Sequence, residues 1–113
     1  MTIPTYDTCI EPLLRLLAKH PEGIRTTEVY EKLADHFQLT ESERAELLPS
    51  GTQVVYHNRI GWAQDRIKRK GLSSSPRRGL WKATEAGVRF IASHPKPLTA
   101  QEIQAIARLE PDK

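Results

Sequence analysis

The residues best suited to chemistry in this chain are basic, and they gather in one stretch. Between His57 and Lys82 there are eight lysines and arginines and a single acid, Asp65, so the stretch has a net charge of +7. The remaining nine basic and thirteen acidic residues carry −4, and the total of +3 conceals this polarity. Guanidinium and ammonium groups at this density bind phosphate, so we expect a polyanionic partner.

Two groups of side chains within the stretch are candidate contacts. Arg59 and Arg66 belong to a predicted long helix, where a guanidinium can fork onto phosphate or onto the O6/N7 edge of guanine. Asn58, on the same helix, suits a bidentate contact to adenine. Arg77 and Arg78 are adjacent on a predicted hairpin tip. Exposed arginines have little structural purpose there, so we expect them in a minor groove or on phosphate.

Each helix candidate also has a structural interpretation. One of the two helix arginines would instead pack over Trp62 and bond Asp65 or a glutamate of the third helix. Asn58 would be a solvated polar residue. Lys68 and Arg69 lie at the end of the helix, where cations complement its dipole, so they contact phosphate at most.

Aromatic side chains offer a second kind of contact. Trp62 and Trp81 can stack on bases, but Trp81 lies on a predicted strand and is better explained by packing. Trp62 falls between the core and the surface of the long helix. His57 and Gln64 are expected on the exposed side of that helix, and a single histidine makes no metal site.

Catalytic patterns are missing from the sequence. It contains no GxxxxGK[ST], HExxH or GxSxG motif and no pair of cysteines. The acids Glu28, Glu31 and Asp35 share a helix face, which solvation explains. The one cysteine, Cys9, is interpreted as a small buried hydrophobe. We therefore expect no catalytic residue, metal ion or cofactor in this chain.

Length and composition indicate one soluble globular domain. The 113 residues are 38% hydrophobic and 27% charged. No apolar run approaches the roughly 20 residues that span a bilayer, and the N-terminus lacks the features of a secretory signal. A cytoplasmic location is expected.

Helical periodicity and capping residues predict six helices, near residues 7–20, 26–37, 41–48, 52–70, 85–93 and 99–108. Asp7 or Thr8 is expected to cap the first helix and Thr52 the long one. A hairpin is expected at residues 72–83, with its tip at residues 73–79, and the short segment 24–25 can pair with it.

The expected core positions follow from the same periodicity. Tyr56, Ile60, Ala63 and Ile67 fall within one arc of the long helix and should face the core. Val88, Ile91 and Ala92 should face inward from the helix that Thr84 caps. Capping boxes are expected at residues 40–43 and 99–102. The last helix, with Ile103, Ile106 and Ala107 on one stripe, is expected to pack back on the domain.

This order of elements predicts an α+β, mostly helical fold: a winged helix (winged helix-turn-helix) with extra helices and a short β-hairpin wing. The predicted winged-helix, DNA-binding domain covers residues 1–94. Residues 95–113 form a linker and a short C-terminal helix, which can lead to a further domain.

Several motifs in the chain resemble the N-terminal domain of Mrr-type restriction proteins, which act on methylated DNA. They are IP (3–4), LTESER (39–44), LPSG (48–51), NRIGWA (58–63), KGL (70–72), SPRRGLW (75–81) and TEAG (84–87). They occur in the right order and spacing over roughly residues 3–92. The resemblance implies a winged-helix reader of duplex DNA joined, in a longer chain, to a nuclease domain of the PD-(D/E)xK class. We favour an excised reading domain, with a stand-alone relative as the alternative.

The resulting hypothesis is a domain that places its long helix in the major groove and its wing on the neighbouring backbone, and that can read methylated DNA. Its partners are double-stranded DNA and a nuclease domain in the same chain. A dimeric transcriptional regulator and a protein-interaction module are the rivals. The candidate DNA-contacting residues are Gln53, His57, Asn58, Arg59, Trp62, Arg66, Lys68, Arg69, Ser74, Ser75, Arg77, Arg78 and Lys82.

Overall fold

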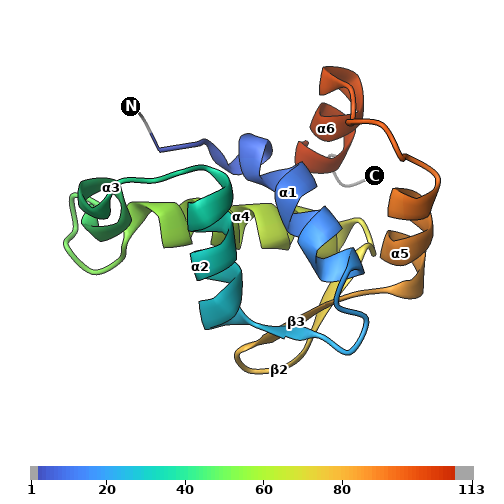
Figure 1. The fold of residues 1–113 in the computed structure, drawn as a ribbon, viewed down its shortest axis with the longest axis horizontal. Coiled ribbons are helices and arrows are strands. Elements are labelled where there is room, and N and C mark those ends of the chain that lie inside the picture. The colour runs from blue at the N-terminus through green and yellow to red at the C-terminus, as the bar shows by residue number, and fades with distance from the viewer. Residues whose placement is uncertain (1–2, 109–113) are drawn as a thin grey trace, which may run out of the picture.

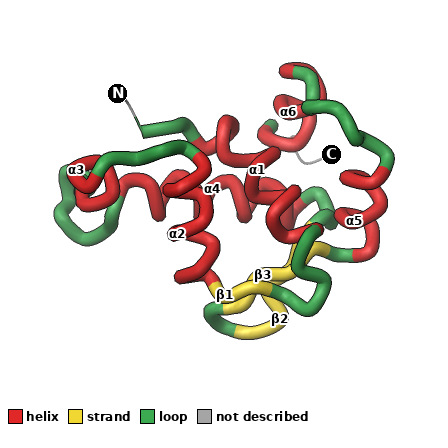
Figure 2. The backbone as a smooth tube through the Cα atoms, in the orientation of Figure 1, coloured by secondary structure: helices red, strands yellow, loops and turns green. Residues whose placement is uncertain are grey.

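The computed structural model describes residues 3–108 as a helical body with a small sheet along one edge (Figures 1 and 2). The mostly helical α+β fold predicted from the sequence is confirmed. In chain order the elements are α1 (Tyr6–Ala18), β1 (Ile24–Arg25), α2 (Thr26–His36), α3 (Glu41–Ala45), α4 (Val55–Arg69), β2 (Ser73–Arg77), β3 (Leu80–Ala83), α5 (Glu85–Ala92) and α6 (Ala100–Ala107).

Helix α1 is the centre of the fold. Its side chains Ile10, Leu13, Leu14 and Leu17 are fully buried, and it contacts α2, α4, α5, α6 and β3. Figure 1 shows it lying across α4. The helix begins at Tyr6, and its N-cap is Thr5, which precedes both predicted cap residues, Asp7 and Thr8. Cys9, on the same helix, is buried as expected, and burial raises the pKa of its thiol to about 12.

The predicted core face of α4 is confirmed. Tyr56, Ile60, Ala63 and Ile67 are all buried, with Ala63 and Ile67 completely inaccessible. Their spacing of three and four residues forms a single stripe along the helix. This stripe packs against α1, so the opposite side of α4 is left facing outward.

Helix α4 starts later than predicted. Leu47 forms a β-bridge with Val54, and Val55 N–H donates to the Glu46 carbonyl at 2.8 Å. These contacts keep residues 46–54 in a closed loop, which also ends α3 at Ala45. Thr52 therefore caps nothing, and Gln53 lies outside the helix. The capping box of α3 is confirmed.

The three strands form an antiparallel sheet in the order β1-β3-β2. The predicted pairing of segment 24–25 is confirmed, since Ile24 lies opposite Trp81. The wing tip is shorter than predicted. Residues Ser73–Arg77 are strand β2 itself, and only Arg78 and Gly79 connect it to β3. Gly79 has a φ of 79°, which this tight turn requires and which glycine adopts without strain.

Helix α5 faces the core only partly as predicted, since Ile91 packs against the core but the other two predicted positions do not. Thr84 caps it as expected, accepting from the Gly87 N–H at 3.1 Å. However, Val88 is 38% exposed and Ala92 is also exposed. The side that faces inward carries Gly87, which is buried against the backbone of Leu72. The helix is therefore rotated so that its smallest residue makes the closest contact.

The C-terminal segment packs on the same core, as expected. The Arg15 guanidinium donates to the His94 carbonyl at 2.8 Å and to the Lys96 carbonyl at 2.9 Å. The capping box at residues 99–102 is present. Beyond it, Ile106 and Ala107 are buried, and α6 contacts both α1 and α4. Within the described residues no helix is long and apolar enough to cross a membrane.

Candidate nucleic-acid interface

The outward side of α4 carries four of the predicted contact residues, and a fifth lies just before the helix. Asn58 is half-buried, and Trp62, Lys68 and Arg69 are exposed, with Gln53 exposed just before the helix. The Asn58 amide donates to the Gln53 side-chain oxygen at 3.1 Å. This pair sets two amides next to each other at the start of the helix. Carboxamides in such a position can read base edges.

The wing presents the second basic group. Ser75, Arg77 and Arg78 are exposed. Neither guanidinium has an ion-pair or hydrogen-bond partner among residues 3–108. Lys82 and Ser74 are half-buried on facing strands, where the Ser74 hydroxyl lies 3.5 Å from the Lys82 carbonyl. The two tip arginines are therefore charges that the described fold leaves uncompensated.

A buried amide fastens the wing to α4. Gln64 is only 4% exposed, although the sequence pattern predicted it at the surface. Its side-chain oxygen accepts from the Ser73 hydroxyl at 3.0 Å, and its Nε2 lies 3.5 Å from the Ser74 carbonyl. A buried carboxamide is stable only when it is bonded in this way. Gln64 is a positioning residue that the sequence reasoning missed.

The far end of the wing is attached as well. The Thr26 N–H, at the start of α2, donates to the Gly79 carbonyl at 2.9 Å. Strand β3 is also paired with β1 through Arg25 and Leu80. The hairpin is thus held at its base by α4 and at its tip by α2. Its arginines project from a fixed scaffold.

Arg66 has the structural role that the sequence analysis gave as the alternative to DNA contact: it packs over Trp62 and bonds Asp65. Its Nε donates to the Ala107 carbonyl at 3.1 Å, and its Nη1 lies 2.5 Å from Asp65 Oδ2. The guanidinium also lies over the rings of Trp62, at 5.1 Å, and Tyr6, at 5.4 Å. The side chain is only 13% exposed. Arg66 therefore ties α6 to α4 and supports Trp62.

Arg59 is on the same flank of α4 as Arg66. Its Nη1 lies 3.4 Å from the Pro4 carbonyl, and the residue is half-buried. The third helix arginine, Arg69, is different. It bonds Asp65 at 2.9 Å but its side chain remains 61% exposed. Of the three, Arg69 is the one that an external phosphate can reach most directly.

His57 belongs to an aromatic cluster between α2, α4 and β3. Its ring stacks on Tyr30 at 3.9 Å between centroids and meets the edge of Tyr56 at 4.3 Å. Trp81 contacts Tyr30 edge to face at 6.1 Å, which agrees with the packing role expected for it. Burial lowers the pKa of His57, because the charged imidazolium loses hydration there. The imidazole is therefore packed against the fold and is not free on the exposed side of α4, where the sequence pattern predicted it.

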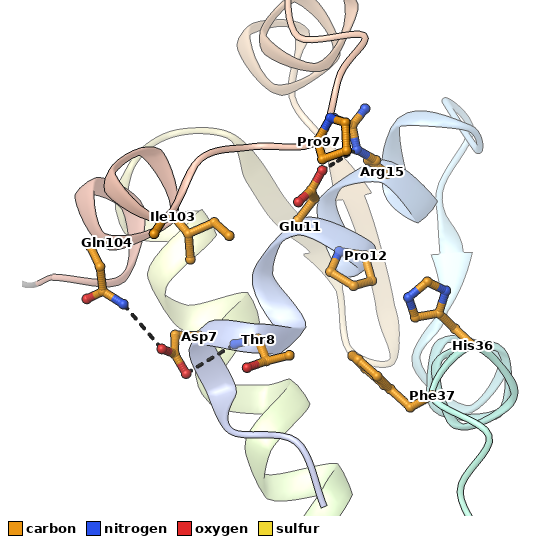
Figure 3. Close-up of a pocket in the computed structure, with 11 residues that line it drawn as sticks. Asp7, Thr8, Glu11, Pro12, Arg15, His36, Phe37, Pro97, Ile103 and Gln104 are labelled. Atoms are coloured by element: carbon orange, nitrogen blue, oxygen red, sulfur yellow. Dashed lines mark hydrogen bonds and ion pairs between the residues drawn. The ribbon is translucent and has the colours of Figure 1, made fainter.

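A separate hollow lies away from the wing (Figure 3). It has a volume of about 550 Å³ and is bounded by α1, the end of α2 and the segment leading into α6. Its wall includes Pro12, Phe37, Pro97 and Ile103. None of the candidate DNA-contacting residues lines it. In the described part of the chain, no cluster of three or more His, Cys, Asp or Glu side chains could hold a metal ion.

Comparison with known proteins shows the family of this chain. The helices and hairpin define a winged-helix domain with a basic outer face. The chain belongs to the Mrr N-terminal domain family, whose model matches residues 6–93. It is 53% identical over 107 residues to the type IV methyl-directed restriction enzyme EcoKMrr of Escherichia coli strain K12. The match covers 95% of this chain and 35% of that enzyme. No solved structure gives a significant match.

The chain therefore spans about a third of the length of the curated relative it matches. The resemblance to Mrr-type restriction proteins, first indicated by the NRIGWA and SPRRGLW motifs, is confirmed.

Proposed function

We propose that this chain is the DNA-reading domain of an Mrr-like restriction protein and that it binds duplex DNA through α4 and the wing. The observation that carries the proposal is the pair Arg77 and Arg78. Both are exposed, have no side-chain partner among residues 3–108, and lie on a hairpin that Gln64 and Thr26 hold in place. Fixed, uncompensated guanidinium groups suit a rigid polyanion, because little conformational entropy is lost on binding.

In the proposed complex α4 lies in the major groove and the wing follows the neighbouring backbone. Asn58 and Gln53 contact base edges. Lys68, Arg69 and Lys82 contact phosphates, together with the hydroxyls of Ser74 and Ser75. Arg59 and Arg66 contribute through the field of their charges, because their guanidinium groups are turned toward the protein, and Arg66 also supports Trp62.

We further propose that the domain prefers methylated duplexes. Support comes from the printed name of the relative, a methyl-directed restriction enzyme. On this chain, the indole of Trp62 is 48% exposed and supported by Arg66. An apolar ring at this position supplies a surface for a methyl group on a base. The nuclease that acts on the bound DNA is proposed to lie in the remaining two thirds of a longer protein.

The test is a fluorescence-anisotropy titration of matched methylated and unmethylated duplexes at several salt concentrations. The variant Arg77→Ala/Arg78→Ala should weaken binding about tenfold at low salt and reduce the slope of log K against log salt by about 2. Lys32→Ala/Arg89→Ala is the control, since it removes two exposed charges from α2 and α5. A methylated duplex should bind more tightly than its unmethylated match.

Other outcomes select the alternatives. Equal binding by the wing variant and the control would refute the proposed surface. A dimer that requires a two-fold site would favour a transcriptional regulator. Absence of salt-sensitive DNA binding in the wild type would favour a protein-interaction module.

A further inference from the structure

Gly61 lies in the interior of α4, a position where glycine is normally unfavourable. Glycine in a helix interior destabilises the helix relative to alanine, because the unfolded chain loses more freedom on folding. A glycine usually has a structural reason for its position. For Gly23, Gly51, Gly71 and Gly79, which lie outside the helices, the reason is a positive φ angle.

No reason of this kind applies to Gly61. Its backbone is regular helix, and a Cβ built on it would meet no atom within 4 Å in the described structure. Gly87, the other helical glycine, is the contrast, because a Cβ there would lie 2.0 Å from the Leu72 carbonyl oxygen. The fold therefore requires glycine at position 87 and has room for a side chain at position 61.

The neighbours of Gly61 are candidate contact residues that the fold holds in place. His57, one turn earlier, is fixed by its stack on Tyr30, and Asn58 is bonded to Gln53. Residues three and four apart on a helix are surface neighbours, so these side chains border the bare backbone of Gly61. On the same helix, Trp62 is supported by Arg66.

We propose that Gly61 is the point of closest approach between α4 and the bound duplex, with a base edge of the major groove packed directly on its backbone. This inference rests on the proposed DNA-reading function and specifies how the same surface works. The short side chain of Asn58 can reach a base edge only if the helix axis lies deep in the groove. A side chain at position 61 would hold the helix away from the bases.

The decisive variant is Gly61→Ala, which should change stability and binding in opposite directions. The melting temperature should rise by about 4 °C, since alanine is the better helix former and has space. Affinity for duplex DNA should fall about tenfold, because one added methyl group overpacks a tight contact. Gly61→Leu should lower affinity further. Ala86→Leu, on the exposed side of α5, is the control for added bulk and should leave binding unchanged.

The outcomes separate this inference from the function on which it rests. If the wild type binds DNA through Arg77 and Arg78 but Gly61→Ala binds equally well, the close approach is refuted and the function stands. A loss of stability in Gly61→Ala would also refute it, since the fold would then require the glycine. If the wild type shows no salt-sensitive binding, both proposals fail.

Discussion

At the scale of single residues, neighbours decide what each arginine does. Arg66 and Arg77 have the same side chain and lie in the same basic stretch of sequence. The guanidinium of Arg66 is occupied by Asp65 and the Ala107 carbonyl, whereas Arg77 has no partner in the described residues. Two nitrogens of the Arg66 guanidinium are bonded within the protein, so this group is less available to a ligand. Among the arginines of the basic stretch, Arg77 and Arg78 are the ones whose side chains have no partner in the described residues.

His57 gives a prediction at this scale. Burial lowers its pKa from the ordinary value of 6.5, so the unfolded chain binds a proton more readily than the folded one. The contribution of neutral His57 to the free energy of unfolding is therefore fully present above pH 6.5. It is lost as the pH falls through the lowered pKa of the folded state. Urea unfolding of the wild type and His57→Phe between pH 5 and pH 8 measures this. The variant should lose less stability on acidification, and parallel pH curves would contradict the expectation.

At the scale of elements, α5 shows how one backbone contact fixes a helix. The Leu72 carbonyl accepts from the Thr84 N–H at 3.0 Å, and the Thr84 hydroxyl donates to the Gly71 carbonyl at 2.6 Å. Gly87 packs directly on the Leu72 carbonyl. The start of α5 is therefore attached to the end of α4 and the base of β2. The position of the wing depends on this junction.

Gly87→Ala tests the junction. The added Cβ would lie 2.0 Å from the Leu72 oxygen, so either the helix or the strand must move. We expect a loss of about 3 kcal/mol in the free energy of unfolding, at the upper end of overpacking effects. Ala86→Gly, the reverse change at an exposed neighbour, should cost about 1 kcal/mol. Chemical denaturation measures both, and equal losses would show that α5 is loosely packed.

At the scale of the whole molecule, the surface formed by the wing and α4 differs in charge from the surface that contains the hollow. The wing and the outer side of α4 carry the basic stretch, including Arg77 and Arg78, which have no side-chain partner in the described residues. The hollow of Figure 3 lies on the other side, between α1, α2 and α6. Its polar groups are already engaged: Glu11 bonds Arg15 and the Leu98 N–H, and Asp7 accepts from Thr8 and Gln104. The hydrogen bond from the Thr5 hydroxyl is the main cause that lowers the pKa of Asp7.

The packing of α6 is a prediction at the same scale. Ile106 is 5% exposed and lies in the core that α1 and α4 share. Ile106→Ala should lower the free energy of unfolding by about 2–4 kcal/mol, from lost burial and the cavity left behind. Gln101→Ala, at an exposed position of the same helix, should change it by less than about 0.5 kcal/mol. Similar values for both variants would mean that α6 adds little to the core.

Elements with strong local signals could be predicted from the sequence. The three- and four-residue spacing of Tyr56, Ile60 and Ala63 was sufficient for the core face of α4. The capping boxes at Thr40 and Thr99 were equally local. The start of α4 was predicted too near the N-terminus. The bridge between residues 47 and 54 that delays it depends on a loop that closes on itself, which no local pattern indicates.

The candidate site was harder to predict, because its roles depend on tertiary neighbours. Gln64 is adjacent to the core stripe, and only the approach of the wing turns that position into a buried one. Arg66 faces α6, which is distant in sequence. The wing arginines were predictable, since a Pro-Arg-Arg-Gly run between three serines and the apolar pair Leu80-Trp81 is typical of an exposed turn. Their DNA contacts stay a prediction.

The attachment of the wing has a consequence for kinetics. A free hairpin would sample many orientations and would fold onto DNA after the first encounter. Here the Gly79 carbonyl is bonded to the start of α2, and Gln64 holds the other end of the hairpin. If the chain binds DNA as proposed, association should then be a single docking step, governed by diffusion and electrostatic steering. The proposed complex would then form and dissociate without a folding step in the wing, so the domain would meet DNA as a rigid body.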